Sequence, residues 1–195
     1  MRMLACMSGM ETAISIALGV GLAAAVGFRV FLPLLVTSIA AFSGHLHLDA
    51  NFAWLGSLPA MTMLGVAAII EVLAYYVPAV DNLLDAITTP LALVAGTVVS
   101  AAVITDLPPL IKWSTAIIAG GGVAAITQGV TTLVRAKSTA FTAGMGNPVV
   151  STVEAIAEVV IALLALLAPL VAIALVAVFC WFAVRWVRRL LRSGR

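Results

Sequence analysis

The chain has 195 residues, of which 64% are hydrophobic and 9% are charged, with a net charge of +2. Soluble domains are about half apolar and a quarter charged, so this composition excludes a soluble globular protein and predicts an integral membrane protein. A helix that crosses a bilayer needs about 20 residues, which leaves no room for a separate soluble domain. We expect a single transmembrane domain over residues 1–195.

The first apolar segment, residues 12–42, is longer than the core of a signal peptide, which has about 7 to 15 residues, and we interpret it as part of the mature domain. It contains one charge, Arg29, between Gly27 and Pro33. A charge at the centre of a bilayer costs about 2.5 to 3.5 kcal/mol or more on insertion scales. Because glycine and proline weaken a helix, we expect this segment to break near Arg29.

The loop after this segment contains His45, His47 and Asp49 at alternating positions. On an extended chain the three side chains would point the same way, as metal ligands do. The pattern alone is weak evidence, and we favour an external loop without a metal.

The apolar run at residues 57–77 contains Glu71. An ionisable group inside a membrane segment is costly unless it is paired, protonated or in a water-filled cavity. After Pro78, Asp81 and Asp85 are four residues apart on one helical face, which suits ion coordination or a proton relay. The alternative is a solvated interfacial helix with Asp81 as its N-cap.

Two further apolar runs cover residues 91–105 and 113–134, and the second contains three glycines at 120–122. Glycines within apolar helices let two backbones approach closely, and we favour this tight packing. The alternative is a broken helix that lines a cavity, since irregular backbone at membrane depth must face protein or water.

A second polar segment, residues 135–158, carries Arg135, Asn147, Glu154 and Glu158. A Gly-Asn-Pro break between helices offers backbone and side-chain dipoles to a polar solute, and the helix start that follows favours an anion. The alternative is a cytoplasmic loop with a capped helix after it.

The last apolar run, residues 153–187, is too long for one crossing and contains Pro169, so it is either two helices or one kinked helix. With six crossings and both termini inside, nearly all basic residues lie in the cytoplasm, as the positive-inside rule requires. We therefore favour about six crossings, with the basic tail at residues 185–195 in the cytoplasm.

Short strings in the two halves of the chain are similar. They are GVGLAA at 19–24 with GGGVAA at 120–125, and AIIEVLA at 68–74 with AIAEVVI at 155–161. They are compatible with a 3+3 inverted repeat with broken helices, formed by halves at about 12–105 and 113–191. Chance matches in a biased composition are the alternative.

Three motifs in this order, GFRVFLPLL, EVLAYYVPAVDNLLDAITTP and RAKSTAFTAGMGNPVVSTVE, resemble the DUF4126 family over roughly residues 14–190. The resemblance implies a small bacterial inner-membrane protein and no particular activity. The chain departs from the family pattern at Tyr75 and Tyr76, where many relatives carry a charged pair. The polar positions that match the family are Arg29, Glu71, Asp81, Asp85, Arg135, Asn147 and Glu154.

We therefore predict an all-α integral membrane protein that acts as a transporter or channel-like permease for an ion or a small polar solute. We expect Arg29 to meet Glu71, either in a dry pair or across water. Acidic residues favour a cation and basic residues favour an anion, so the charge of the solute stays open. The candidate binding residues are Arg29, Glu71, Asp81, Asp85, Arg135, Asn147, Glu154 and Glu158.

Two other functions remain as alternatives: a membrane scaffold whose buried charges are structural, and a lipid-modifying enzyme. We do not favour an enzyme, because no nucleophile or metal set is visible in the sequence. No cofactor is expected. The expected partners are the lipid bilayer and the solute, with a homo-oligomer left open. Nucleic acid is not expected, because the basic residues gather in the tail.

Overall fold

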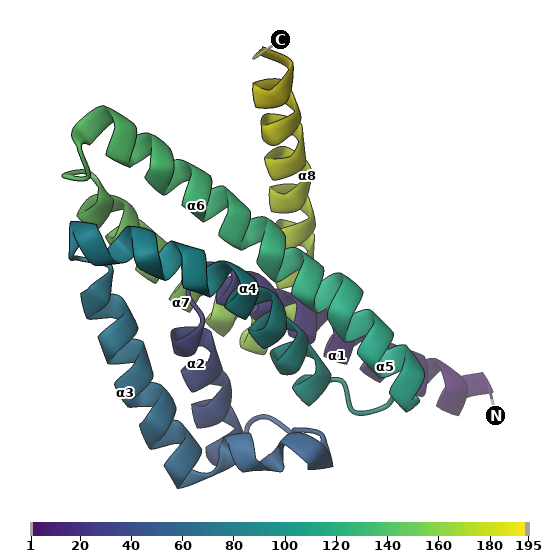
Figure 1. Cartoon of the computed structure of the whole chain (residues 1–195). Coiled ribbons are helices and arrows are strands. Elements are labelled where there is room, and N and C mark those ends of the chain that lie inside the picture. The colour runs from purple at the N-terminus through teal and green to yellow at the C-terminus, as the bar shows by residue number, and fades with distance from the viewer. Residues whose placement is uncertain (1, 194–195) are drawn as a thin grey trace.

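The computed structural model describes residues 2–193, except for the side chains of residues 2–8, 78, 79, 81, 82 and 190–193. Every regular element in this part of the chain is a helix (Figure 1). In chain order the helices are α1 (Arg2–Val26), α2 (Phe31–Phe42), η1 (Ala50–Gly56), α3 (Leu58–Ala74), α4 (Pro78–Val103), α5 (Pro109–Thr115), η2 (Ala116–Gly121), α6 (Gly122–Thr142), α7 (Asn147–Leu167) and α8 (Pro169–Ser193).

Five stretches of helix in the described residues are long and apolar enough to cross a bilayer. They are Gly9–Val26, Leu83–Val103, Pro109–Thr142, Asn147–Leu167 and Pro169–Arg189. The pair η1 and α3, bent by 64°, adds a sixth if it counts as one span, and α2 is a shorter apolar helix of 12 residues. The prediction of an all-α membrane protein with about six transmembrane or half-membrane helices is confirmed.

Helix α1 packs at the centre of the fold, with α4 and α6 on one side of it. The Ser100 hydroxyl of α4 donates a hydrogen bond of 2.9 Å to the Gly19 carbonyl, and Gly96 lies against Ala23, so α4 runs opposite to α1. Gly120 lies against Ser100 and Gly96 against Ala124, so the α5–α6 span runs opposite to α4. Helices α1 and α6 therefore run in the same direction.

This direction bears on the expected inverted repeat. The strings at 19–24 and 120–125 lie on α1 and on the span of η2 and α6. An inverted repeat requires such a pair of helices to run in opposite directions. Because the two helices are parallel, these strings do not mark an inverted repeat.

The chain reverses between α7 and α8, where Pro169 begins a new helix. The side chain of Ala165 in α7 and that of Ala172 in α8 both lie against Gly21 of α1. The rings of Phe28 and Phe179 lie 6.3 Å apart, so α8 runs parallel to α1. The last apolar run thus forms two helices in a hairpin rather than one kinked helix.

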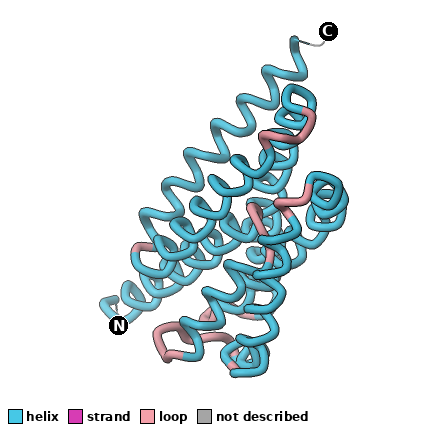
Figure 2. Tube along the Cα trace, turned by 90° about the vertical axis from the view of Figure 1, so that its left-hand side faces the viewer, coloured by secondary structure: helices cyan, strands magenta, loops and turns pink. Residues whose placement is uncertain are grey.

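Helices α2 and α3 form a second hairpin, which leaves the end of α1 and returns to it. The Ser38 hydroxyl of α2 donates a hydrogen bond of 2.6 Å to the Leu55 carbonyl, and Glu71 near the end of α3 contacts the start of α2. The start of α1 and the end of α8 consequently lie at opposite ends of the molecule (Figure 2). This arrangement does not fit the expectation that both termini lie on one side.

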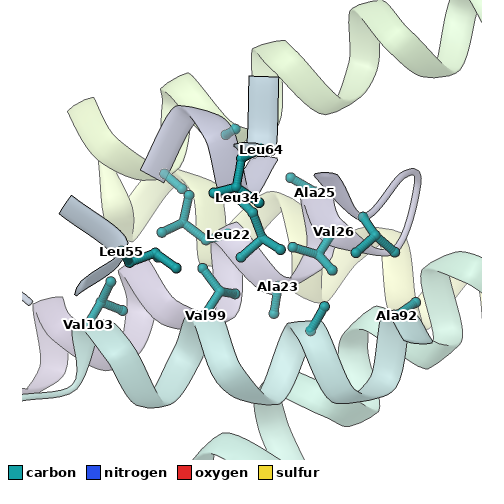
Figure 3. Packing of buried hydrophobic residues seen from close by; sticks show 14 of the residues in the cluster. Leu22, Ala23, Ala25, Val26, Leu34, Leu55, Leu64, Ala92, Val99 and Val103 are labelled. Carbon is teal, nitrogen blue, oxygen red and sulfur yellow. The ribbon is translucent and has the colours of Figure 1, made fainter. Parts of the chain in front are cut away.

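Small side chains let these helices approach closely. A Cβ at Gly27 would lie 2.5 Å from the Ala124 carbonyl oxygen of α6, so only glycine fits there. The core mixes alanines with branched side chains, as Figure 3 shows for the cluster between α1, α2 and α4. We favour tight packing for the glycines at 19, 21, 27 and 120–122. The structure confirms it for five of them, since each lies within contact distance of a neighbouring helix, but not for Gly122, where a Cβ would meet no atom within 4 Å.

Candidate functional site

The break between α1 and α2 is held by a carboxylate from α3. The backbone N–H groups of Val30 and Phe31 donate hydrogen bonds of 2.9 and 3.0 Å to the two oxygens of Glu71. These N–H groups begin α2 and have no partner within their own helix. The positive end of the helix dipole also favours a negative charge at this place. Glu71 therefore caps α2 from a neighbouring helix.

Arg29 lies inside the break and is fully buried. Its Nη2 donates a hydrogen bond of 2.6 Å to the Ser151 carbonyl of α7. Its Nε lies 4.0 Å from Oε1 of Glu158, which is also fully buried. We expected Arg29 to meet Glu71, but the two form no direct ion pair: Glu71 bonds to the backbone after Arg29, while the guanidinium contacts α7.

A second guanidinium, that of Arg135 in α6, joins two more acidic side chains. Its Nε donates a hydrogen bond of 3.0 Å to Oε2 of Glu154 in α7, and its Nη2 donates to the same oxygen. Its Nη1 donates a hydrogen bond of 3.1 Å to Oδ1 of Asp85 in α4. All three side chains are buried. Arg135 thus ties together α4, α6 and α7.

Tyr75 connects the two arginines. Its ring centroid lies 5.1 Å from Cζ of Arg29 and 3.8 Å from Cζ of Arg135, and both distances fit cation–π contacts. Its hydroxyl lies 3.3 Å from Oγ1 of Thr88, which also accepts a hydrogen bond of 3.0 Å from Nε2 of Gln128. We use the name charge network for Arg29, Glu71, Tyr75, Asp85, Arg135, Glu154 and Glu158.

The charge network holds more acidic groups than basic ones. It contains four carboxyl groups and two guanidinium groups, all buried. A buried charge is costly unless it is paired and hydrogen-bonded. Glu71, Asp85 and Glu154 each accept hydrogen bonds, whereas neither oxygen of Glu158 has a hydrogen-bond partner among the described residues. Glu158 is therefore the acidic group whose charge is least compensated.

Other buried polar atoms in the described part of the chain also lack a hydrogen bond. Among them are Nε and Nη1 of Arg29, Oγ of Ser151, Oγ1 of Thr127 and Oε1 of Gln128. Buried polar atoms in native proteins are almost always bonded to protein, water or ligand. Ser151, Glu154 and Glu158 follow one another at helical spacing, so they share one face of α7. This face offers the chemistry of a small polar binding site.

Of the eight candidate residues, the structure brings six into the charge network: Arg29, Glu71, Asp85, Arg135, Glu154 and Glu158. The amide of Asn147 instead donates a hydrogen bond of 2.9 Å to Oγ1 of Thr139, near the start of α7. The side chain of Asp81 lies outside the described residues.

Sequence reasoning missed Tyr75, Thr88 and Gln128. One signal was present for Gln128, because an amide inside an apolar membrane helix needs a polar partner. A second signal was present for Tyr75, which follows Glu71 by one helical turn and so lies on the same face. Tyr75, one of the two positions at which the chain departs from the family pattern, thus contacts both guanidinium groups.

A separate ion pair lies at the other end of the helices. Nζ of Lys112 donates a hydrogen bond of 2.7 Å to Oδ2 of Asp49, and this contact lowers the pKa of Asp49 below its ordinary value. The other oxygen of Asp49 accepts a hydrogen bond of 3.1 Å from the N–H of Asn51 at the start of η1. The His45 ring lies 3.0 Å from the Ser43 hydroxyl. In the described residues, no group of three His, Cys, Asp or Glu side chains is placed to hold a metal.

Fold and charge network together define a class: a multi-pass helical membrane protein with charged side chains buried between its helices. The chain belongs to the family described as Domain of unknown function (DUF4126), whose model matches residues 16–189. Comparison with curated proteins and with solved structures gives no match. The resemblance noted in the three sequence motifs is confirmed, and the family description assigns no activity.

Proposed function

We propose that this protein is a small permease that moves an ion or small polar solute across the membrane, and that the charge network binds a cation, the proton included. The observation that carries this proposal is Glu158, a fully buried carboxyl group with no hydrogen bond to either oxygen among the described residues. Ionisable groups inside membrane segments mark ion pathways and proton relays in many membrane proteins.

The excess of carboxyl groups favours a cation over an anion. Counted along the chain, acidic and basic candidates leave the charge of the solute open. In the fold, four carboxyl groups face two guanidinium groups in one buried network. Binding a cation or proton at this network offsets the surplus negative charge, whereas binding an anion increases it.

The break between α1 and α2 supports transport as well. Transporters place solute sites at discontinuous helices near the middle of the membrane, where free backbone groups face the ligand. Here Arg29 lies in the break. The two backbone N–H groups that have no partner within α2 donate hydrogen bonds to Glu71. A change in the charge of Glu71 would therefore act directly on the start of α2, and a change in the charge of Glu158 would act on Arg29 in the break.

The proposed location is the bacterial inner membrane, with the C-terminal end of α8 in the cytoplasm. Lys137 of α6 and the arginines of α8 lie at the same end of the molecule, since Nζ of Lys137 lies 4.7 Å from the Trp186 ring. Lys112 lies near the beginning of the α5–α6 span, at the other end. Lys and Arg gather on the cytoplasmic side of membrane proteins, which supports this orientation.

The test is ion flux in proteoliposomes that contain a pH-sensitive dye, with a membrane potential set by K⁺ and valinomycin. We expect the wild-type protein to conduct protons, or Na⁺ or K⁺ in the matching assays, and Glu158→Gln to abolish the flux while it still folds. Glu11→Gln is the matched control, because Glu11 is exposed near the start of α1. Wild-type flux of all three cations equal to that of empty liposomes would contradict the proposal.

The second candidate is a membrane scaffold. It is favoured by Arg135, whose guanidinium is bonded to both Glu154 and Asp85 and so fixes α4, α6 and α7 relative to one another. Removing one partner of a buried ion pair costs about 3 to 5 kcal/mol. If Glu158→Gln fails to assemble, while Glu11→Gln folds normally, the scaffold function gains and the permease proposal loses its main support.

A further inference from the structure

Helices α6 and α8 diverge toward their C-terminal ends, as Figure 1 shows. Their side chains leave a groove of about 680 Å³ between them, open to the outside of the molecule. Its lining includes Val130 and Val134 of α6 and Phe179, Phe182, Arg185 and Arg189 of α8. It lies apart from the charge network, and none of its lining residues belongs to that network.

One end of the groove is apolar and the other is basic. The apolar end is formed by Phe179, whose ring packs against that of Phe28 in the break between α1 and α2. At the basic end, Arg185 and Arg189 line the groove, and Nζ of Lys137 reaches across from α6 to the Trp186 ring, 4.7 Å away. Tryptophans gather at the interface between hydrocarbon and headgroups, so this end lies at that interface.

The length of the groove fits one leaflet of a bilayer. Ten residues of α8 separate Phe179 from Arg189, which is about 15 Å at 1.5 Å per residue. The hydrocarbon core of a bilayer is about 30 Å thick, so half of it is about 15 Å. An acyl chain that starts among the arginines would therefore end near Phe179.

We propose that this groove binds one anionic phospholipid. Its phosphate would lie among Lys137, Arg185 and Arg189, and one acyl chain would pack along Val130, Val134 and Phe182. The positive charge at the basic end of the groove selects an anionic headgroup, because basic side chains at the membrane surface attract anionic lipid. The apolar walls select a lipid over a free phosphate, which has no group to fill them. This inference does not depend on what the protein transports.

The chain offers a matched control for the arginines. Arg188 is a neighbour on the same helix and carries the same charge, but it does not line this groove; it lines an adjoining hollow, which Arg185 and Arg189 also border. Native mass spectrometry of the purified full chain would measure binding of phosphatidylglycerol, with phosphatidylcholine as the neutral lipid. We expect wild-type protein to retain one phosphatidylglycerol in preference to phosphatidylcholine.

Arg185→Gln and Arg189→Gln should each weaken phosphatidylglycerol binding about tenfold, the size expected for one charge-assisted contact. Arg188→Gln should bind as the wild type does. Equal losses in all three variants would overturn the proposal, because they would indicate general attraction of anionic lipid to a basic tail. A lack of preference between the two lipids would overturn it as well.

A second pair of variants tests the walls of the groove. Val134→Trp should fill the groove and reduce phosphatidylglycerol binding, whereas Val178→Trp, on an exposed part of α8 outside the groove, should not. Thermal unfolding in detergent would check that both variants fold. Binding unchanged by Val134→Trp would overturn the proposal. So would a lipid-free dimer that Val134→Trp disrupts, since the groove would then be occupied by a second copy of the chain.

Discussion

Oε1 of Glu158 in α7 lies 4.0 Å from Nε of Arg29, which belongs to the break between α1 and α2. Both side chains are fully buried. The separation is too long for a hydrogen bond, so the two charges attract each other without sharing a proton. The free energy of coupling between these two side chains is the first quantity to measure, because removing one partner of a buried charge pair strongly destabilises a protein.

We predict that Arg29→Gln destabilises the protein by about 3 to 5 kcal/mol, because it removes the hydrogen bond to the Ser151 carbonyl and leaves Glu158 without its nearest cation. Glu158→Gln added to this variant should restore part of the lost stability. A double-mutant cycle by thermal unfolding in detergent measures the coupling. Strictly additive effects would contradict the pairing.

The cap on α2 gives a second prediction. Glu71→Ala should destabilise the protein by about 1 to 3 kcal/mol, since it leaves the buried N–H group of Val30 and the partly buried N–H group of Phe31 unbonded. Glu71→Gln should cost less, because its amide oxygen still accepts one of the two bonds. Glu11→Ala, at an exposed position, should have little effect. The measurement is thermal unfolding, and equal effects of the two Glu71 variants would contradict the capping role.

Tyr75 contributes both its ring and its hydroxyl to the charge network. Tyr75→Phe keeps the ring beside Arg29 and Arg135 and loses only the contact with Thr88, so it should cost about 0.5 to 1.5 kcal/mol. Tyr75→Leu also loses the two cation–π contacts and should cost more, by about 1 kcal/mol or above. Equal losses of stability in the two variants, measured by thermal unfolding, would show that the contacts of the ring with the two guanidinium groups contribute nothing to stability.

Glycine packing gives a prediction with a control in the same bundle. Gly27→Ala should destabilise by about 1 to 3 kcal/mol, because its Cβ would collide with the Ala124 carbonyl oxygen and with Thr127. Gly129→Ala meets no atom within 4 Å and should be neutral or slightly stabilising, since alanine favours a helix interior. If Gly27→Ala were as stable as the wild type, α1 and α6 would have to lie farther apart.

The ion pair of Asp49 and Lys112 predicts that the stability of the folded protein depends on pH. The hydrogen bond from Lys112 holds the pKa of Asp49 below its ordinary value of 3.8, so the folded state binds this proton less readily than the unfolded state does. The pair therefore contributes its full stability above pH 3.8, and this contribution is lost as the pH falls through the folded pKa. Asp49→Asn should remove this acid-side dependence, as measured by unfolding between pH 6 and pH 3. An unchanged pH profile would contradict the contact.

The sequence predicted the membrane class, the helical fold and the six charged residues of the charge network, though not Tyr75, because apolar length and costly charges are both readable from one chain. It did not predict the partner of Arg29. Glu71 and Glu158 are equivalent candidates by composition, and only helix packing decides that one caps the backbone while the other faces the guanidinium. The expected repeat did not fit for the same reason, since helix direction depends on packing partners far apart in the sequence.

The position of Arg29 also has a consequence for biosynthesis. Its hydrogen-bond acceptor, the Ser151 carbonyl, follows it by 122 residues. Ribosomes add about 5 to 20 residues per second, so Arg29 leaves the ribosome on the order of ten seconds before α7 exists. During that interval the first helices must hold a charge whose final contacts have not been made. The final packing of the N-terminal part around Arg29 is therefore completed only after the α7–α8 hairpin has been made, so the last quarter of the chain is needed to complete assembly.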